Sequence, residues 1–76
     1  MTIKPNPVHD YTTFTYMGNM EDVILTLVSM NGEILRQIEI HLNETIIQKE
    51  QLTSGVYFAK ISVKGEQKVV LKLIIL

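Results

Sequence analysis

The side chains able to carry acid–base or metal chemistry are few in this sequence and widely spaced. His9 stands beside Asp10, and a histidine next to a carboxylate is a common fragment of a metal site or a catalytic base. No further His or carboxylate cluster accompanies this pair, Glu21-Asp22 alone does not make a site, and the chain has no cysteine. A metal centre needs several converging ligands, and nucleophilic catalysis needs a nucleophile, a base and an orienting group. We interpret His9 and Asp10 as solvated loop residues and predict no enzymatic activity, no metal and no cofactor.

Nucleotides, nucleic acids and membranes are also disfavoured as ligands. The sequence contains neither Gly-x-Gly-x-x-Gly nor a Walker-type loop. The formal net charge is −1 and the seven Lys and Arg residues are scattered, so no basic patch attracts a polyanion. The apolar ending, Leu73 to Leu76, is far too short to span a bilayer. We expect no nucleic-acid partner and no membrane insertion, and a signal peptide would belong to a longer precursor.

The most informative stretch runs from Leu52 through Gly55 to Tyr57. It has the Leu-x-x-Gly-x-Tyr pattern of a tyrosine corner, in which a turn enters an antiparallel strand and the Tyr hydroxyl bonds back to the backbone a few residues upstream. Gly55 can take the positive φ of a corner, Leu52 closes the end of a core, and Tyr57 adds a large ring with one polar tip. The pattern indicates a Greek-key β-sandwich. The alternative is an ordinary turn before an amphipathic strand.

A first hairpin is predicted around Asn31-Gly32. Both residue types accept the positive φ of a type I′ turn, so we expect a two-residue loop that pairs Met30 with Glu33. Arg36 falls on the apolar face of this hairpin and must extend its charged head past the rim. The apolar face itself is predicted to consist of Val23, Leu25, Leu27, Ile34, Ile38 and Ile40.

A second hairpin is predicted at the end of the chain. Its two apolar faces are Tyr57, Ala59, Ile61 and Val63 on one strand and Val69, Leu71, Leu73 and Ile75 on the other. These faces coincide only if the loop has an odd number of residues, so we predict the loop Val63-Lys64-Gly65 with Gly65 left-handed. A two-residue loop would set Glu66, Lys68 and Lys72 against the core.

Turn signals at intervals of roughly eight to twelve residues and the absence of helical periodicity predict an all-β fold. We expect an immunoglobulin-like Greek-key β-sandwich of about seven short antiparallel strands, formed by a single domain over residues 1–76. The outward faces are unusually apolar, so part of them could bind a partner, or they could be the scattered apolar residues of an ordinary surface. The outward apolar residues are Ile24, Val28, Leu35, Val56, Phe58, Val70, Ile74 and Leu76.

Four features recur in a characteristic order from Ile3 to the C-terminus: the Pro5-Asn6-Pro7 start, Asn31-Gly32, the tyrosine corner and a lysine-bearing last strand. In this order and spacing the sequence resembles the C-terminal sorting domain of type IX secretion cargo, also called the Por secretion type A sorting domain. The resemblance implies a non-catalytic signal at the end of a longer secreted protein. It also implies a route through the periplasm to the cell surface or medium, with an outer-membrane translocon and a sortase-like protease as partners.

The resemblance assigns two groups of residues. We expect the proline-rich start, Gly32 and the tyrosine corner to hold the fold. The family's signature positions are Pro5, Asn6, Pro7, Asn31, Gly32, Leu52, Gly55 and Tyr57, together with the basic Lys68 and Lys72 of the last strand. The candidate recognition surface is on the last strand and consists of Lys68, Val70, Lys72 and Ile74. Family members often keep a basic residue at the terminus, whereas this chain ends with apolar residues.

Two other readings stay open. One is a generic immunoglobulin-like or fibronectin-like spacer or binding module of a cell-surface protein, although a carbohydrate-binding module would need a row of exposed aromatic side chains. The other is a weak homodimer through the exposed apolar strand face, which could coexist with the sorting role. Its contact residues would be Val56, Phe58, Val70 and Ile74.

Overall fold

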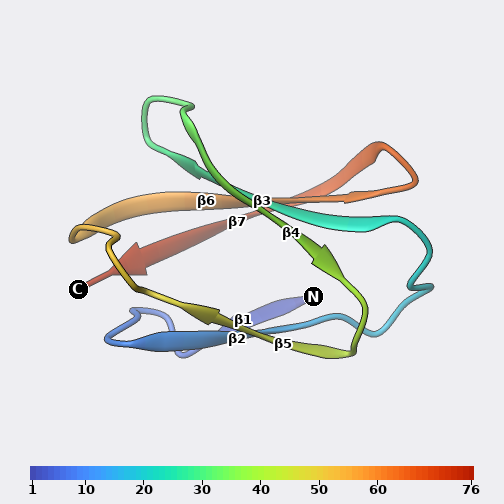
Figure 1. Ribbon diagram of the computed structural model, residues 1–76, viewed down its shortest axis with the longest axis horizontal. Coiled ribbons are helices and arrows are strands. Elements are labelled where there is room, and N and C mark those ends of the chain that lie inside the picture. The colour runs from blue at the N-terminus through green and yellow to red at the C-terminus, as the bar shows by residue number, and fades with distance from the viewer.

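The computed structural model describes residues 1–76, and all of its regular secondary structure is β-strand. Every paired strand is antiparallel to its neighbour. One sheet has the order β1-β2-β5 and the other the order β4-β3-β6-β7 (Figure 1). The prediction of an all-β fold with seven antiparallel strands is confirmed. The strands are β1 (Thr2–Lys4), β2 (Tyr11–Thr15), β3 (Val23–Ser29), β4 (Ile34–Ile40), β5 (Glu44–Gln48), β6 (Gly55–Val63) and β7 (Glu66–Ile75).

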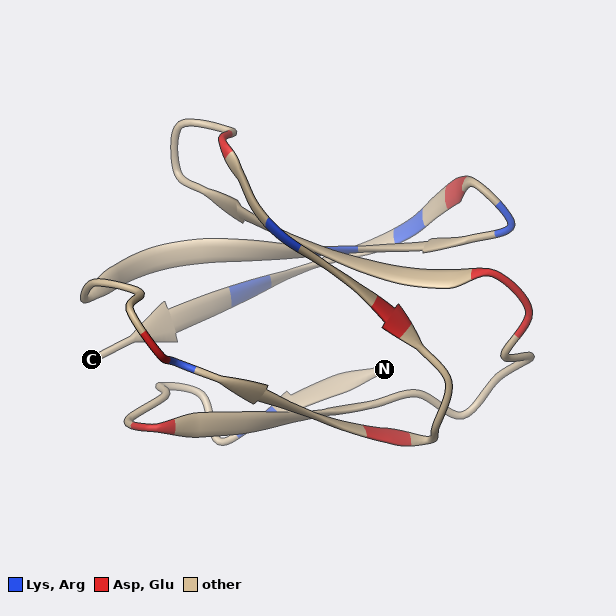
Figure 2. Cartoon of the chain, viewed as in Figure 1, with Lys and Arg blue, Asp and Glu red and all other residues tan.

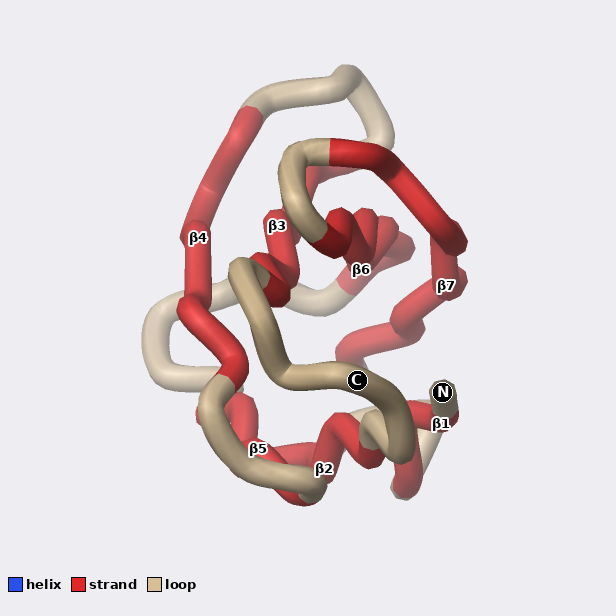
Figure 3. The backbone as a smooth tube through the Cα atoms, turned by 90° about the vertical axis from the view of Figure 1, so that its right-hand side faces the viewer, coloured by secondary structure: helices blue, strands red, loops and turns tan.

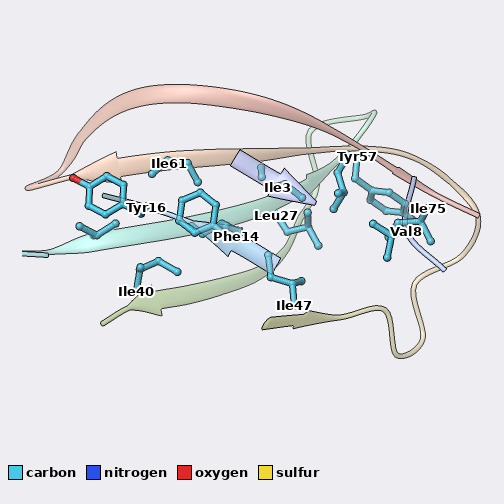
Figure 4. Close-up of a cluster of buried hydrophobic side chains, with 14 residues drawn as sticks. Ile3, Val8, Phe14, Tyr16, Leu27, Ile40, Ile47, Tyr57, Ile61 and Ile75 are labelled. Atoms are coloured by element: carbon cyan, nitrogen blue, oxygen red, sulfur yellow. The ribbon is translucent and has the colours of Figure 1, made fainter. Parts of the chain in front are cut away.

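The core lies between the two sheets and is built from alternate residues of each strand, because successive side chains of a strand point to opposite faces. Phe14 of β2, Leu27 of β3 and Ile61 of β6 are fully buried and belong to the same cluster between the sheets (Figure 4). Most of the predicted apolar faces are confirmed by burial. The members of the buried cluster are Ile3, Val8, Phe14, Tyr16, Val23, Leu25, Leu27, Ile40, Ile47, Tyr57, Ala59, Ile61, Leu73 and Ile75.

The turn of the β3–β4 hairpin differs from the prediction. The amide of Gly32 donates to the carbonyl of Ser29 at 3.0 Å, and the amide of Ser29 donates to the carbonyl of Glu33 at 2.9 Å. The loop therefore contains three residues, and Gly32, with φ of 85°, is its one residue with positive φ. A type I′ turn requires positive φ at both central residues. The predicted two-residue turn with Met30 opposite Glu33 is wrong.

An extra residue in β4 compensates for the longer loop. Leu27 lies opposite Arg36, whereas the next residue of β3 lies opposite Ile34, so Leu35 is left over as a β-bulge. The bulge exchanges the two side chains near it: Ile34 is 61% exposed, and Leu35 packs against the core. We predicted the reverse for both residues. From Arg36 onward the register is the predicted one.

The turn of the β6–β7 hairpin also differs from the prediction. Val63 pairs directly with Glu66, so the loop is the two-residue stretch Lys64-Gly65. Both loop residues have positive φ, 53° and 79°, as a type I′ turn requires. The predicted three-residue loop is wrong.

The predicted faces of this hairpin are nevertheless correct, because a second bulge shifts the register. Ile61 lies opposite Val69 but Ser62 lies opposite Gln67, which leaves Lys68 as the extra residue. Beyond the bulge the inward faces of β6 and β7 coincide. A loop that is longer or shorter by one residue moves every later side chain to the other face of the strand, and a bulge of one residue moves it back. In each hairpin the loop differs from the prediction by one residue and a bulge offsets the difference, so the side chains beyond the bulge lie on the predicted faces.

The tyrosine corner is present before β6. The Tyr57 hydroxyl donates to the carbonyl oxygen of Thr53 at 2.6 Å, and its ring is buried. Leu52 packs against the core from the same loop. Gly55 has a φ of 157°, a positive value that residues with a side chain rarely adopt. The predicted bond from the Tyr hydroxyl back to the upstream backbone is confirmed.

Replacing Tyr57 with Phe is expected to lower the free energy of unfolding by about 1–2 kcal/mol, because the Thr53 carbonyl loses its donor. Urea denaturation of the purified chain measures the change. Tyr11→Phe is the matched control, since the Tyr11 side chain is 52% exposed and its replacement should change stability by less than about 0.5 kcal/mol. Equal effects from the two substitutions would contradict a stabilising role for the corner.

Candidate recognition surface

The proline-rich start of the chain is attached to the last strand. The Asn6 side chain donates from Nδ2 to the carbonyl of Lys72 at 2.8 Å and accepts at Oδ1 from the amide of Ile74 at 2.9 Å. Asn6 thus takes the place of a neighbouring strand residue at the edge of β7. Pro5 is held in turn by its carbonyl, which accepts from the Thr12 hydroxyl at 2.8 Å.

Val8 continues this attachment toward the C-terminus. It forms a parallel bridge with Ile75, in which the Val8 amide donates to the carbonyl of Ile74 at 2.7 Å and the Leu76 amide donates to the Val8 carbonyl at 2.9 Å. Lys49 also donates to the carbonyl of Leu76 at 2.8 Å. The last residues of the chain are therefore held by segments distant in sequence. The structure brings Asn6 together with Lys72 and Ile74, whereas Asn31 and Gly32 are exposed at the β3–β4 turn.

The outward sides of β6 and β7 form a contiguous surface, here called the β6–β7 face. In the strand register Val56 lies opposite Ile74, Phe58 opposite Lys72, and Lys60 opposite Val70. Side chains opposite each other on one face of an antiparallel pair are direct neighbours. Basic and apolar side chains alternate across this face. Its residues are Val56, Phe58, Lys60, Val70, Lys72 and Ile74.

The two lysines of the face and Val70 are its exposed members. Lys60 and Lys72 are exposed, Val70 is 43% exposed, and Phe58 is half-buried. Val28 of β3 lies opposite Phe58 and is 3% exposed although it does not belong to the core between the sheets. The face therefore has an apolar base from which two charged side chains extend into solvent.

Lys68 differs from the other predicted recognition residues. It is the bulge residue of β7, and its Nζ lies 3.4 Å from the Glu66 carboxylate. Val70, Lys72 and Ile74 lie together on the β6–β7 face, whereas the charge of Lys68 already has a partner. Lys60 was missed in the sequence, because its position opposite Val70 depends on the register beyond the bulge.

The remaining charges leave the β6–β7 face positive. Ion pairs occupy Arg36, Lys64 and Lys68, and neither Lys60 nor Lys72 takes part in one. Figure 2 shows the acidic residues of the four-stranded sheet near strand ends and turns, and blue segments in the middle of β6 and on β7. A chain with net charge −1 thus presents two unpaired positive charges on one sheet.

The chain matches a known protein family over nearly its whole length. Residues 2–76 match the family described as "Secretion system C-terminal sorting domain". The chain belongs to this family. No curated protein matches the chain. The sequence-based resemblance to the sorting domains of type IX secretion is confirmed, and it extends over nearly the whole domain.

Membership defines the role of this sorting domain in outline. The domain is a C-terminal secretion sorting signal. Membership in the family implies an interaction with the secretion system and secretion to the cell surface or the extracellular space. Sorting domains of this family are generally non-catalytic.

Other features of the sorting domain add no second site. His9 and Asp10 are exposed, and no three His, Asp or Glu side chains gather where they could hold a metal ion. The surface hollows lie between the start of β3 and the second half of β4 and beside β5. They are open to solvent, and no residue of the β6–β7 face lines them. No helix in the structure has the length and apolarity needed to cross a membrane.

Proposed function

We propose that this sorting domain is the last domain of a longer secreted protein and directs that cargo across the outer membrane through the type IX translocon. The domain itself catalyses no reaction. The observation that carries the proposal is the family match over residues 2–76, which spans both sheets and the complete core. Residues 1–76 then act as one unit that must be folded to be recognised.

The route follows from the same proposal. The cargo enters the periplasm with a signal peptide, and the folded sorting domain is read there by the outer-membrane translocon. A sortase-like protease then removes the domain, and the cargo is released or attached to the cell surface. Nucleic acids and insertion into the membrane play no part in this route.

We also propose that the fold is an immunoglobulin-like Greek key. The first, second and fifth strands share one sheet and the third, fourth, sixth and seventh share the other, which corresponds to strands A, B and E against C′, C, F and G. The position of Tyr57 supports this assignment. In immunoglobulin-like domains the tyrosine corner lies between strands E and F, and here it lies between β5 and β6.

A fusion experiment tests the sorting function. A fluorescent protein with an inner-membrane signal peptide and residues 1–76 at its C-terminus is produced in a bacterium with a working type IX system. We expect the fusion in the medium or on the cell surface, and in the periplasm of an isogenic strain without the translocon. The same fusion without residues 1–76 is the control and should stay in the periplasm of both strains.

A folded fusion that stays in the periplasm while an endogenous cargo is exported would contradict the sorting function for this chain. That result would favour the hypothesis that the domain is a spacer or binding module of a cell-surface protein. The structure gives carbohydrate stacking little support, because Phe14, Tyr16 and Tyr57 are buried and Tyr11 is the one aromatic side chain that is largely exposed.

A further inference from the structure

We propose that the β6–β7 face docks on an acidic protein surface of the secretion machinery, with Lys60 and Lys72 facing carboxylates and Phe58 facing an apolar patch between them. This inference rests on the proposed sorting function. The sequence placed the recognition surface on the last strand alone, whereas the proposed docking surface includes residues of both β6 and β7 and does not include Lys68.

The geometry of the two lysines suits a pair of carboxylates on one partner segment. Lys60 lies opposite Val70, two residues from Lys72 on β7, so the lysines are diagonal neighbours on the same face. Such positions are about 7–8 Å apart at the backbone. Phe58 lies directly opposite Lys72 and supplies apolar area beside both charges.

The charge state of the face favours an outside partner. Lys60 has Thr26 and Val70 as its cross-strand neighbours, and neither carries a charge. Lys68, by contrast, has its ion-pair partner Glu66 within 3.4 Å. Unpaired exposed charges contribute modestly to affinity, but they select partners of opposite sign and accelerate association.

The same charges argue against two other occupants. A second copy docked through this face would bring like charges together, which disfavours a homodimer. Two lysines on a chain of net charge −1 are also too few for the multiple phosphate contacts that drive binding to nucleic acid. An acidic protein surface with an apolar patch would supply carboxylates for the two lysines and apolar contacts for Phe58.

A binding experiment with paired variants tests the inference. The purified chain is titrated with inside-out outer-membrane vesicles, which expose the periplasmic side of the membrane, from a bacterium with a working type IX system, and with equivalent vesicles from an isogenic strain without the translocon. The test variant is Lys60→Gln with Lys72→Gln. The matched control, Lys4→Gln with Lys68→Gln, removes the same charge from β1 and from the ion-paired bulge. Thermal unfolding checks that all three chains are equally folded.

We expect the Lys60/Lys72 variant to bind the translocon-containing vesicles about three- to tenfold more weakly than wild type, and the Lys4/Lys68 control to bind within about twofold. Wild-type binding should weaken with added salt more steeply than binding of the Lys60/Lys72 variant, because the missing charges no longer contribute. Export of the fluorescent fusion should fall in the same order.

Several outcomes would overturn the inference. Equal losses in the two double variants would remove the β6–β7 face as the site, and equal binding to translocon-free vesicles or to protein-free anionic lipid vesicles would make lipid the partner. Wild-type dimerisation that the Lys60/Lys72 substitutions strengthen would make a second copy the occupant.

If wild-type fusion is exported and the Lys60/Lys72 fusion is exported equally well, this inference alone fails. If wild type neither binds nor is exported, the sorting function fails with it.

Discussion

Deletion of Leu73 to Leu76 is expected to unfold the domain. Leu73 and Ile75 are 1% and 2% exposed, and loss of one such buried side chain costs about 2–5 kcal/mol. The deletion also removes the pairing of β7 with the start of β6 and both hydrogen bonds to Val8. A domain this small has a free energy of unfolding of only about 5 kcal/mol, so the combined loss exceeds it.

Circular dichroism and urea denaturation of the truncated chain measure this effect. Deletion of Leu76 alone is the control, because its side chain is 48% exposed and it takes part only in the bonds with Val8 and Lys49. We expect that shorter deletion to cost about 1 kcal/mol and to leave a cooperative transition. A cooperative transition after the four-residue deletion would show that the end of β7 is dispensable for the fold. If the four-residue deletion unfolds the domain, a loss of export after that truncation reflects unfolding and carries no information on recognition.

Replacement of Arg36 by Met is expected to lower the free energy of unfolding by about 2–3 kcal/mol. Arg36 lies opposite Leu27, and its guanidinium donates to the carbonyls of Gln48 and Lys49 at the end of β5. These bonds join the two sheets beside the core. Methionine keeps the apolar stem but leaves two backbone carbonyls without their charged donor.

Two further variants separate the parts of this interaction. Glu50→Gln removes only the ion pair, whose N–O distance is 3.8 Å and whose carboxylate side chain is 66% exposed, so we expect a change below about 0.5 kcal/mol. Arg36→Lys keeps the charge without the planar fork and should be intermediate. The interpretation is incorrect if urea denaturation shows the Glu50 variant to be as unstable as Arg36→Met.

Arg36 and the Asn6–Val8 segment close opposite sides of the sandwich. Figure 3 shows β4 above β5 on one side and β7 above β1 on the other. Arg36 connects β4 to the end of β5, and Asn6 connects the segment after β1 to β7. The β6–β7 face lies on the outside of a sheet whose edge strand is held by Asn6. The asparagine therefore supports the candidate recognition surface without belonging to it.

The sequence by itself determined the fold class, most of the core and the tyrosine corner. These features depend on short-range rules: alternation of apolar residues marks the buried face of a strand, and Leu52, Gly55 and Tyr57 lie close enough in sequence to define a corner. The same alternation placed Val70, Lys72 and Ile74 on one outward face. The family resemblance was visible for the same reason, since its features are short motifs in a fixed order.

Only the tertiary structure decided where the two bulges lie, what Arg36 and Asn6 bind, and which lysines are free. One extra residue moves the following side chains to the other face of the strand, whether it lies in the turn or in a bulge. The apolar pattern of a hairpin therefore shows how the two faces match but not where the extra residue lies. The bulge in β4 places Leu35 instead of Ile34 on the core side. The bulge in β7 leaves Lys68 without a partner residue on β6 and sets the register in which Lys60 is the diagonal neighbour of Lys72. The partners of Arg36 and Asn6 lie on strands distant in the chain or across the sandwich, and no local pattern records such contacts.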